Sequence, residues 1–318
     1  MTTAARDTAA TTPDTPAAVA VVRGLSKVYG DVVAVRDVTF EVRPGEAVGL
    51  LGPNGAGKTT SVKALVGLVS PSGGAVELFG RPPTDPRARA ELGYLPELFR
   101  FPDWLTGREV LELHARLAGV APQEAPLRID EVLERVGLAG RGQERVRGYS
   151  KGMSQRLGVG QAILARPALV VLDEPTSALD PLGRRMVREV IAELTRDGTA
   201  VLLNSHLLAE VESVCHRVVV LDRGAVRWSG RLDELAPAGA VLRVRVDVVD
   251  PTLASTLSRF GPVRVLGPDL LAVHVPHADD ASEIAEVIVG AGRRLLELTA
   301  PRRTLEEAYV QMITDSDQ

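Results

Sequence analysis

The spacing of apolar residues divides the chain into runs of strands and a helical stretch between them. VTFEV at 38–42 alternates apolar and polar residues, and AVGLL at 47–51 is a continuous apolar run. These patterns predict a half-buried strand and a fully buried strand. Between 101 and 148 the apolar residues recur at helical spacing, as in REVLELHARLAGV. The sequence therefore predicts an α/β core that a mostly helical insert interrupts.

The α/β pattern resumes after the insert. ALVVLDEP at 168–175 and TAVLLNSH at 199–206 have the pattern of buried strands, and a helix is predicted at 186–194 between them. VVVLDRGAVRWSG at 218–230 predicts a hairpin that turns at 222–224. Because strands alternate with helices, we expect a parallel sheet that is covered on both faces.

A second, smaller unit is predicted toward the C-terminus. A Pro/Gly/Ala-rich stretch at 233–240 has the composition of a linker, and strict apolar alternation begins again in LRVRVDVV at 242–249. The next elements are predicted in the order strand, helix, strand, strand, helix, strand, with a final helix from Thr304. This is the order of a small ferredoxin-like α+β domain, in which no residues with recognisable chemistry are found.

Composition narrows the choice of partner and compartment. The 318 residues carry a net charge of -4 with a pI near 5.8, so no nucleic-acid partner is expected. The single cysteine, Cys215, lies in an apolar-periodic stretch and is expected to be a buried thiol. No apolar run reaches the ~18 residues of a membrane span, and the tract 1–18 lacks a signal-peptide pattern. We therefore expect a disordered N-terminal tail and a cytoplasmic protein.

GPNGAGKTT at 52–60 fits the phosphate-binding pattern G-x-x-x-x-G-K-[ST], and it stands between a predicted strand and a predicted helix. The glycines let backbone N–H groups curl around phosphates, Lys58 reaches the β- and γ-phosphate oxygens, and the Thr59 hydroxyl binds Mg²⁺. ATP and Mg²⁺ are therefore the expected ligands. The residues expected to contact the nucleotide are Gly52, Pro53, Asn54, Gly55, Ala56, Gly57, Lys58, Thr59 and Thr60.

LVVLDE at 169–174 places two carboxylates at the carboxyl end of a buried strand. Open α/β sheets bind their ligands at this edge. Because a phosphate loop precedes it in the chain, Asp173 is expected to hold Mg²⁺, and Glu174 is expected to orient or deprotonate the attacking water.

In this order the motifs resemble the ATP-binding subunits of ABC transporters over residues 20–232. The resemblance implies a P-loop NTPase core of the ABC ATPase type, whose mixed sheet carries an antiparallel β-subdomain and a helical subdomain. It also implies that Tyr29 stacks on adenine, that Asp180 belongs to the D-loop, and that His206 contacts the γ-phosphate.

YSKGM at 149–153 occupies the position of the signature motif in that family. The resemblance implies that two subunits sandwich two ATPs, and that Ser150 and Gly152 of one subunit bind the γ-phosphate held by the other. This chain has Lys151 where glycine is usual and Met153 where glutamine is usual, a variant associated with exporters.

GYLPE at 93–97 departs further from the family pattern, because Glu97 stands where a glutamine usually senses Mg²⁺ and the attacking water. Its carboxylate favours the metal but repels the γ-phosphate, by about 1 kcal/mol at 4 Å in water and about 4 kcal/mol at an effective dielectric constant of 20. Glu97 is therefore expected to act in both catalysis and metal binding.

Four aromatic residues gather at the start of the helical insert: Tyr94, Phe99, Phe101 and Trp104. They either form a groove for a partner's helix or fill the core of the insert, and physics alone does not decide between these. The resemblance favours a groove, because it implies that a membrane-spanning permease subunit docks here.

The resemblance implies an ATPase that pairs with a second ABC subunit, as a homodimer, to power export through separate permease subunits at the inner face of the cell membrane. Two alternatives stay open: a soluble, non-transport ABC ATPase and an ATP-gated binding module. The expected domains are a tail at 1–18, an ABC ATP-binding domain at 19–234 with a helical subdomain at about 98–155, and a C-terminal accessory domain at 235–318.

Overall fold

The computed structural model describes residues 17–235, 240–276, 280–299 and 305–314, and divides the chain into two units, Met1–Ser229 and Gly230–Gln318. Nearly all of the expected N-terminal tail, and part of the expected linker at 233–240, lie outside the described residues. Among the described helices, none has the length and apolarity needed to span a bilayer.

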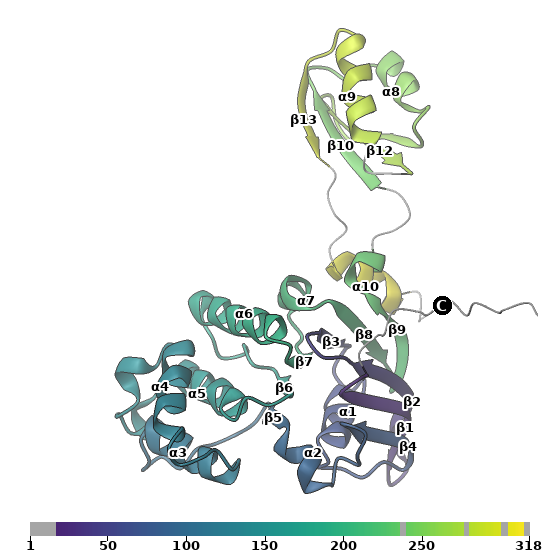
Figure 1. The fold of residues 1–318 in the computed structure, drawn as a ribbon. Helices are drawn as coiled ribbons and strands as arrows, with labels where there is room; N and C mark the ends of the chain where they lie inside the picture. Colours follow the sequence, from purple (N-terminus) through teal and green to yellow (C-terminus); the bar gives the residue numbers. More distant parts are fainter. Residues whose placement is uncertain (1–16, 236–239, 277–279, 300–304, 315–318) are drawn as a thin grey trace, which may run out of the picture. The chain divides into compact units, whose positions relative to one another are not determined.

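The main sheet of the first unit has six strands in the order β5-β6-β7-β3-β8-β9 (Figure 1). The neighbours from β5 to β8 pair in parallel, and Arg223 and Gly224 have φ values of 48° and 81° at the turn between β8 and β9. Two positive φ values in a two-residue turn suit a tight hairpin. The strands are β3 (Ala47–Leu51), β5 (Leu92–Leu95), β6 (Leu169–Asp173), β7 (Ala200–Asn204), β8 (Arg217–Asp222) and β9 (Ala225–Arg231).

Both faces of this sheet are buried. On one face, Val48 and Leu50 of β3 belong to a core that α1 (Lys58–Leu65) shares. On the other face, a Cβ on Gly49 would lie 2.5 Å from the Val211 side chain of α7 (Leu208–Val214), so glycine is needed for this close approach. Helix α6 (Pro181–Arg196) packs on β7, and it is longer than the helix predicted at 186–194 because Asp180 caps it and proline follows.

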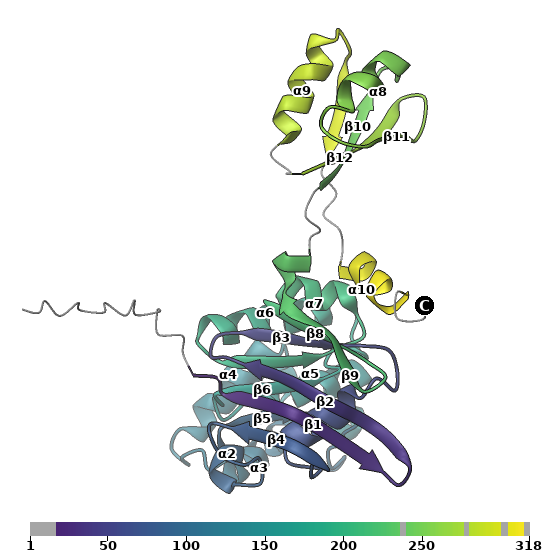
Figure 2. The same ribbon diagram turned by 90° about the vertical axis from the view of Figure 1, so that its right-hand side faces the viewer.

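A second sheet of the first unit is antiparallel, with the strand order β2-β1-β4 (Figure 2). Helix α1 contacts all three of these strands and also β6, so it joins the two sheets through one core. The expected mixed architecture, with antiparallel strands beside a parallel sheet, is thereby confirmed. The strands are β1 (Ala20–Tyr29), β2 (Val32–Val42) and β4 (Gly73–Leu78).

The helical insert lies between β5 and β6. Thr106 accepts a hydrogen bond from the Glu109 backbone N–H, and the Glu109 side chain accepts one from the Thr106 backbone N–H. This capping box explains why the first long helix begins where it does. The helices of the insert are α3 (Gly107–Leu117), α4 (Ala125–Arg135) and α5 (Lys151–Ile163), with 3₁₀ turns at Ala139–Arg141 and Val146–Gly148; the short helix α2 (Pro86–Ala90) precedes β5.

The second unit contains one antiparallel sheet in the order β11-β12-β10-β13. Apolar residues from its strands and from helices α8 and α9 form a separate core. Its elements are a 3₁₀ turn at Leu232–Leu235, β10 (Ala240–Val246), α8 (Pro251–Leu257), β11 (Val263–Val265), β12 (Leu270–Val275), α9 (Ala281–Gly290), β13 (Leu295–Thr299) and α10 (Leu305–Thr314).

Candidate nucleotide-binding site

The glycine-rich loop runs from the end of β3 to the start of α1, as the sequence predicts. Gly52, Gly55 and Gly57 have φ values of 152°, 82° and 98°, which side chains rarely allow. A Cβ on Gly52 would lie 2.3 Å from the Leu221 carbonyl oxygen, and one on Gly57 would lie 2.8 Å from the Ala34 carbonyl oxygen. Only glycine fits at these two positions, so the shape of the loop depends on them.

Several backbone donors of this loop have no acceptor. Among the described residues, none accepts a hydrogen bond from the N–H groups of Gly55, Gly57, Lys58 or Thr59. N–H groups that converge at the start of a helix form an anion site, since the helix dipole adds positive potential there. Ala56 differs, because its N–H donates to the Pro53 carbonyl at 3.1 Å and therefore shapes the loop itself.

Lys58 is almost fully buried at the base of the loop. Its ammonium donates hydrogen bonds to the carbonyl oxygens of Gly52, at 2.6 Å, and of Pro53, at 3.1 Å. Burial lowers the pKa of Lys58, and the carboxylates of Glu174, Asp173 and Glu97 oppose this shift. The ammonium is thus positioned next to the loop as the positive charge that phosphate oxygens require.

Asp173 ends β6 and is only 1% exposed. Burial raises the pKa of its carboxyl group, the Asn204 amide opposes the shift with a 2.5 Å hydrogen bond, and the nearby carboxylates of Glu97 and Glu174 add to it. A bound cation relieves this buried negative charge.

The donor set around Asp173 fits Mg²⁺. The Asn204 side-chain oxygen is buried without a partner among the described residues, as is the Ser61 hydroxyl of α1. Among the described residues there is no group of three His, Cys, Asp or Glu side chains that would hold a metal unaided. Mg²⁺ usually keeps several waters and takes few protein ligands when phosphate oxygens complete its shell. The Asp173 carboxylate and the Thr59 hydroxyl are suited to hold such an ion, and the Asn204 side-chain oxygen is suited to accept a hydrogen bond from one of its waters.

Replacing Asp173 by asparagine is expected to stabilise the nucleotide-free protein. Because burial raises the pKa of Asp173 above its ordinary value of 3.8, the folded state holds this proton more tightly than the unfolded state. Stability therefore falls as the pH rises through the raised pKa, and at neutral pH the full penalty is present. Removing it should increase the free energy of unfolding by roughly 0.5–2 kcal/mol, as measured by thermal denaturation at pH 7.

Two further measurements check the cause of this gain. At pH values well below 3.8 both states hold the proton, so the gain should disappear. In addition, Mg²⁺-ATP should raise the melting temperature of the native protein much more than that of the variant, because the variant lacks the carboxylate that is expected to hold the metal. An unchanged or lower melting temperature for the nucleotide-free variant would contradict the prediction that the buried charge of Asp173 destabilises the folded state.

Glu174 and His206 form a hydrogen-bonded pair. One carboxylate oxygen of Glu174 accepts from the His206 backbone N–H at 3.0 Å, and the other lies 2.7 Å from the imidazole Nδ1. Glu174 has a φ of 52°, and its N–H donates to the Asn204 carbonyl at 2.8 Å. A left-handed backbone at a non-glycine residue persists only where contacts hold it, and it often marks a functional position. These contacts fix the carboxylate at the edge of the sheet.

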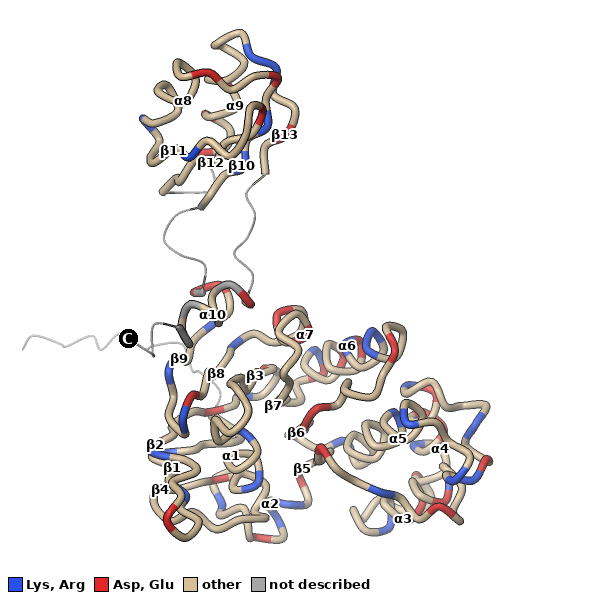
Figure 3. The backbone as a smooth tube through the Cα atoms, turned by 180° about the vertical axis from the view of Figure 1, so that it is seen from behind, with Lys and Arg blue, Asp and Glu red and all other residues tan. Residues whose placement is uncertain are grey.

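Glu97 lies at the same edge. Strand β5 pairs with β6 in the register Leu95↔Leu172, and Glu97 and Glu174 follow the ends of these two neighbouring strands. Figure 3 shows acidic residues where these two strands end. Glu97 is exposed and has no hydrogen bond or ion pair with any described residue. The structure therefore brings three carboxylates, Asp173, Glu174 and Glu97, close to one ammonium group.

Two residues near this site were missed by the sequence reasoning. Asn204 ends β7 and bonds to Asp173, while the Gln155 amide donates to the Glu174 carbonyl at 3.2 Å. A polar residue at the end of a buried apolar strand was the available signal for Asn204. Gln155 gave no signal, because its helix position alone does not reveal which strand it faces.

Two helix starts carry Ser150, Gly152 and Asp180, and the hydrogen bonds of the Ser150 and Asp180 side chains are local to those starts. Ser150 caps α5 by accepting from the Met153 N–H at 3.1 Å, and Asp180 caps α6 by accepting from the Gly183 N–H at 2.8 Å. A Cβ on Gly152 would lie 3.4 Å from the Ala178 carbonyl, so the start of α5 lies beside the 177–180 loop. Among the described residues, no hydrogen bond joins this pair of caps to the phosphate loop of the same chain.

Tyr29 stands at the end of β1 with 46% of its surface exposed. The Lys27 ammonium lies 5.0 Å from the centre of its ring, and it also donates to the Ser70 carbonyl at 2.8 Å. An exposed aromatic ring with a fixed neighbour is a suitable platform for a nucleotide base.

The four clustered aromatic residues have different environments. The rings of Phe99 and Phe101 pack edge to face at 5.3 Å, and a Cβ on Gly158 of α5 would lie 2.8 Å from the Phe99 ring. Tyr94 packs against the main core, whereas Trp104 is 68% exposed. The cluster therefore divides between packed rings and one surface ring, that of Trp104.

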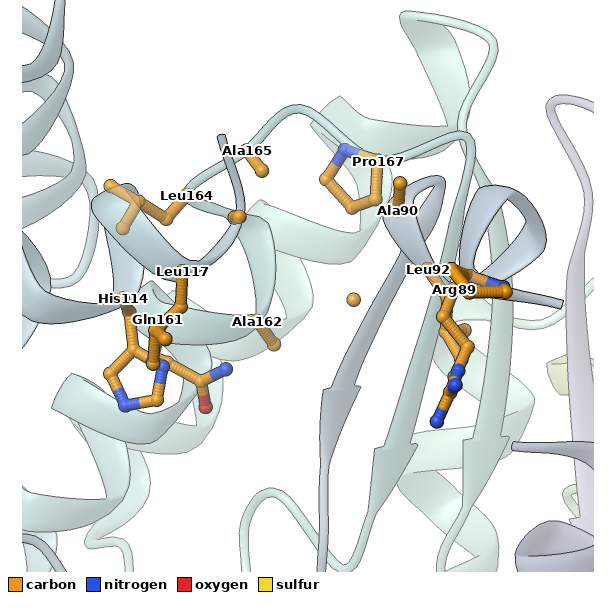
Figure 4. Close-up of a pocket in the computed structure, with 13 residues that line it drawn as sticks. Arg89, Ala90, Leu92, His114, Leu117, Gln161, Ala162, Leu164, Ala165 and Pro167 are labelled. Atoms are coloured by element: carbon orange, nitrogen blue, oxygen red, sulfur yellow. The ribbon is translucent and has the colours of Figure 1, made fainter. Parts of the chain in front are cut away.

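A cavity of about 370 Å³ lies between the helical insert and the start of β5 (Figure 4). Its lining is mostly apolar, and its polar groups come from Arg89, His114 and Gln161. Burial lowers the pKa of His114. None of the residues expected to bind nucleotide lines this cavity, so it is a separate surface feature.

Comparisons with known proteins relate the chain to one family. Residues 35–177 match the family described as ABC transporter. An uncharacterized ABC transporter ATP-binding protein of Nostoc is 38% identical over 96% of this chain and 93% of its own length. The Nod factor export ATP-binding protein I of Burkholderia thailandensis is 39% identical over 91% of this chain and 94% of its own length.

Among solved structures, a dimeric ATP-binding cassette in a post-hydrolysis state with ADP and Pi matches with a TM-score of 0.62 and 23% identity, covering 67% of this chain and 98% of that one. At this identity the match supports the fold. Together with the loop around Lys58 and the carboxylates that end β6, these relationships show that the chain belongs to the ATP-binding proteins of the ABC transporter family, whose members hydrolyse ATP.

Proposed function

We propose that this chain is the ATP-hydrolysing subunit of an exporter, in which two copies close around two ATPs. One observation carries the proposal: Lys58, Asp173 and Glu174 converge at one edge of the sheet, while Ser150 and Gly152 form no hydrogen bond with that site in their own chain. In the proposed dimer, Ser150 and Gly152 bind the ATP that the phosphate loop of the second copy holds.

The residues of one chain have distinct tasks in this proposal. The free N–H groups of the loop and the Lys58 ammonium hold the phosphates, and Tyr29 holds the base. Mg²⁺, when bound by Asp173 and Thr59, neutralises charge on the phosphate oxygens. Glu174 accepts a proton from the attacking water at a carboxylate oxygen, and His206 keeps that carboxylate oriented.

The second copy completes the site. The N-terminus of α5 carries free N–H groups and the positive end of the helix dipole, so Ser150 and Gly152 are suited to bind a γ-phosphate. Asp180 lies in the loop beside this helix start and belongs to the same contact surface. The dimeric cassette with a similar fold supports this arrangement.

We propose that a membrane-spanning permease subunit docks on the helical insert and holds this chain at the inner face of the cell membrane. The exposed side chains of Leu98 and Trp104, at 88% and 68%, and the cavity lined by His114 and Leu117 offer apolar contact area there. The similar Nod factor export proteins favour the direction of export. Residues 19–234 are assigned to ATP binding and residues 235–318 to an accessory domain.

Photo-crosslinking in native membranes tests this proposal. A photoreactive amino acid at Trp104 is expected to attach to a protein with membrane-spanning helices. The matched control is the same probe at Leu68, which is similarly exposed at 63%, lies outside the helical insert and should not capture that protein. Recovery of ribosomal proteins alone at Trp104 would overturn the transporter role.

A further inference from the structure

Glu97 adds a negative charge to the candidate nucleotide site. The carboxylates of Asp173, Glu174 and Glu97 lie near the ammonium of Lys58 in the phosphate loop, and Asp173 also interacts with Lys63. The family usually has a neutral glutamine in place of Glu97, so this chain carries one more negative charge where phosphates bind. At 4 Å in water, the repulsion between two such charges weakens binding about fivefold. A positive charge placed close to Glu97 would offset this repulsion.

The lysines of this chain have an unusual distribution. Of the 37 basic residues only four are lysines: Lys27, Lys58, Lys63 and Lys151. Lys27 lies beside Tyr29, Lys58 lies in the phosphate loop, and Lys63 of α1 interacts electrostatically with Asp173. Three of the four lysines thus surround the nucleotide site, where a compact, mobile point charge suits phosphate and carboxylate oxygens. The fourth lysine is Lys151.

Lys151 is the first residue of α5, immediately after the Ser150 cap. Its side chain is exposed and has no hydrogen bond or ion pair with any described residue. A positive charge in the first turn of a helix opposes the helix dipole. Neither local helix stability nor a partner within the described chain accounts for this lysine, which suggests a partner on another molecule.

We propose that Lys151 of one copy neutralises Glu97 of the other copy across the ATP-bound dimer. The proposal rests on the dimer described above, in which the start of α5 reaches the γ-phosphate of the neighbouring site. The lysine in place of glycine and the glutamate in place of glutamine then form one compensated change. Each dimer contains two such pairs.

A double-mutant cycle on the full chain tests this pairing, with dimerisation as the measured quantity. Sedimentation with a non-hydrolysable ATP analogue and Mg²⁺ gives the dimerisation constant of the native chain, Lys151→Gln, Glu97→Gln and the double variant. We expect Lys151→Gln alone to weaken dimerisation at least about fivefold. In the Glu97→Gln background the same change should have less than about a twofold effect.

Two comparisons separate the pairing from a general effect of charge. Lys151→Arg keeps the positive charge and should dimerise like the native chain, whereas higher salt should reduce the difference between native and Lys151→Gln. The matched control is Arg116→Gln, which removes one exposed positive charge from α3 and should leave dimerisation unchanged.

The outcomes distinguish this proposal from the dimer itself. Dimerisation of the native chain with equal losses from Lys151→Gln in both backgrounds would overturn the pairing and leave the dimer in place. A native chain that stays monomeric with the analogue would overturn both. A loss that depends on Glu97 supports both.

Discussion

Replacing Glu174 by glutamine is expected to lower ATP turnover by roughly 10²–10⁴-fold while the ATP-bound dimer accumulates. The amide cannot accept the proton of the attacking water. It still offers an oxygen to the His206 N–H, so the geometry of the pair is kept. The change also removes one negative charge near the phosphates, which favours the closed state. Phosphate release and sedimentation with ATP measure the two effects.

The matched control for this variant is Glu112→Gln on α3, an exposed glutamate away from the sheet edge. Its turnover should equal that of the native chain. Undiminished turnover in Glu174→Gln would remove this residue from its proposed role as the base, and a variant that neither hydrolyses ATP nor dimerises would indicate lost binding instead.

Two inactive variants are expected to restore activity when mixed. Lys58→Ala damages the phosphate loop, and Gly152→Glu places a negative charge where α5 is proposed to meet the γ-phosphate. A Cβ at Gly152 has no neighbour closer than 3.4 Å, so a side chain can begin there at an ordinary contact distance. Each variant alone should lose roughly 10³-fold or more in turnover, since a contact supplied in trans has that order of effect.

The recovery follows from how the sites are shared. In a mixed dimer, the intact loop of the Gly152→Glu copy faces the intact α5 of the Lys58→Ala copy, which gives one complete site. With random exchange, half of the dimers are mixed, so turnover should return to about a quarter of the native value. Gly148→Glu, with no atom within 4 Å of its Cβ, is the control and should stay active alone. Mixtures without recovery would show that each chain completes its own site.

Much of the nucleotide site was predictable from the sequence because its main parts are local. The loop around Lys58 lies between a strand and a helix that are adjacent in the chain, and Asp173 ends an apolar run. A strand, a glycine turn and a helix start fix the position of backbone donors within a few residues. The comparisons with known proteins confirm the expected family, fold class and ATPase activity.

Other parts were not predictable because they depend on the strand order. Asn204 bonds to Asp173 across 31 residues of chain, and Glu97 becomes a neighbour of Glu174 only because β5 pairs with β6. No local pattern specifies which strands become neighbours, since that choice depends on how the helices cover both faces.

By itself, the sequence determined which segments form strands, loops and helices. It also determined which capping residues, glycines and carboxylates stand at the ends of these elements. The reason is that periodicity, glycine conformation and capping act over a few residues. Tertiary structure alone decided that Phe99 and Phe101 pack against each other while Trp104 is exposed, and that three carboxylates lie near Lys58. Burial and electrostatic fields are sums over segments that are distant in the chain, so they exist only after those segments have packed together.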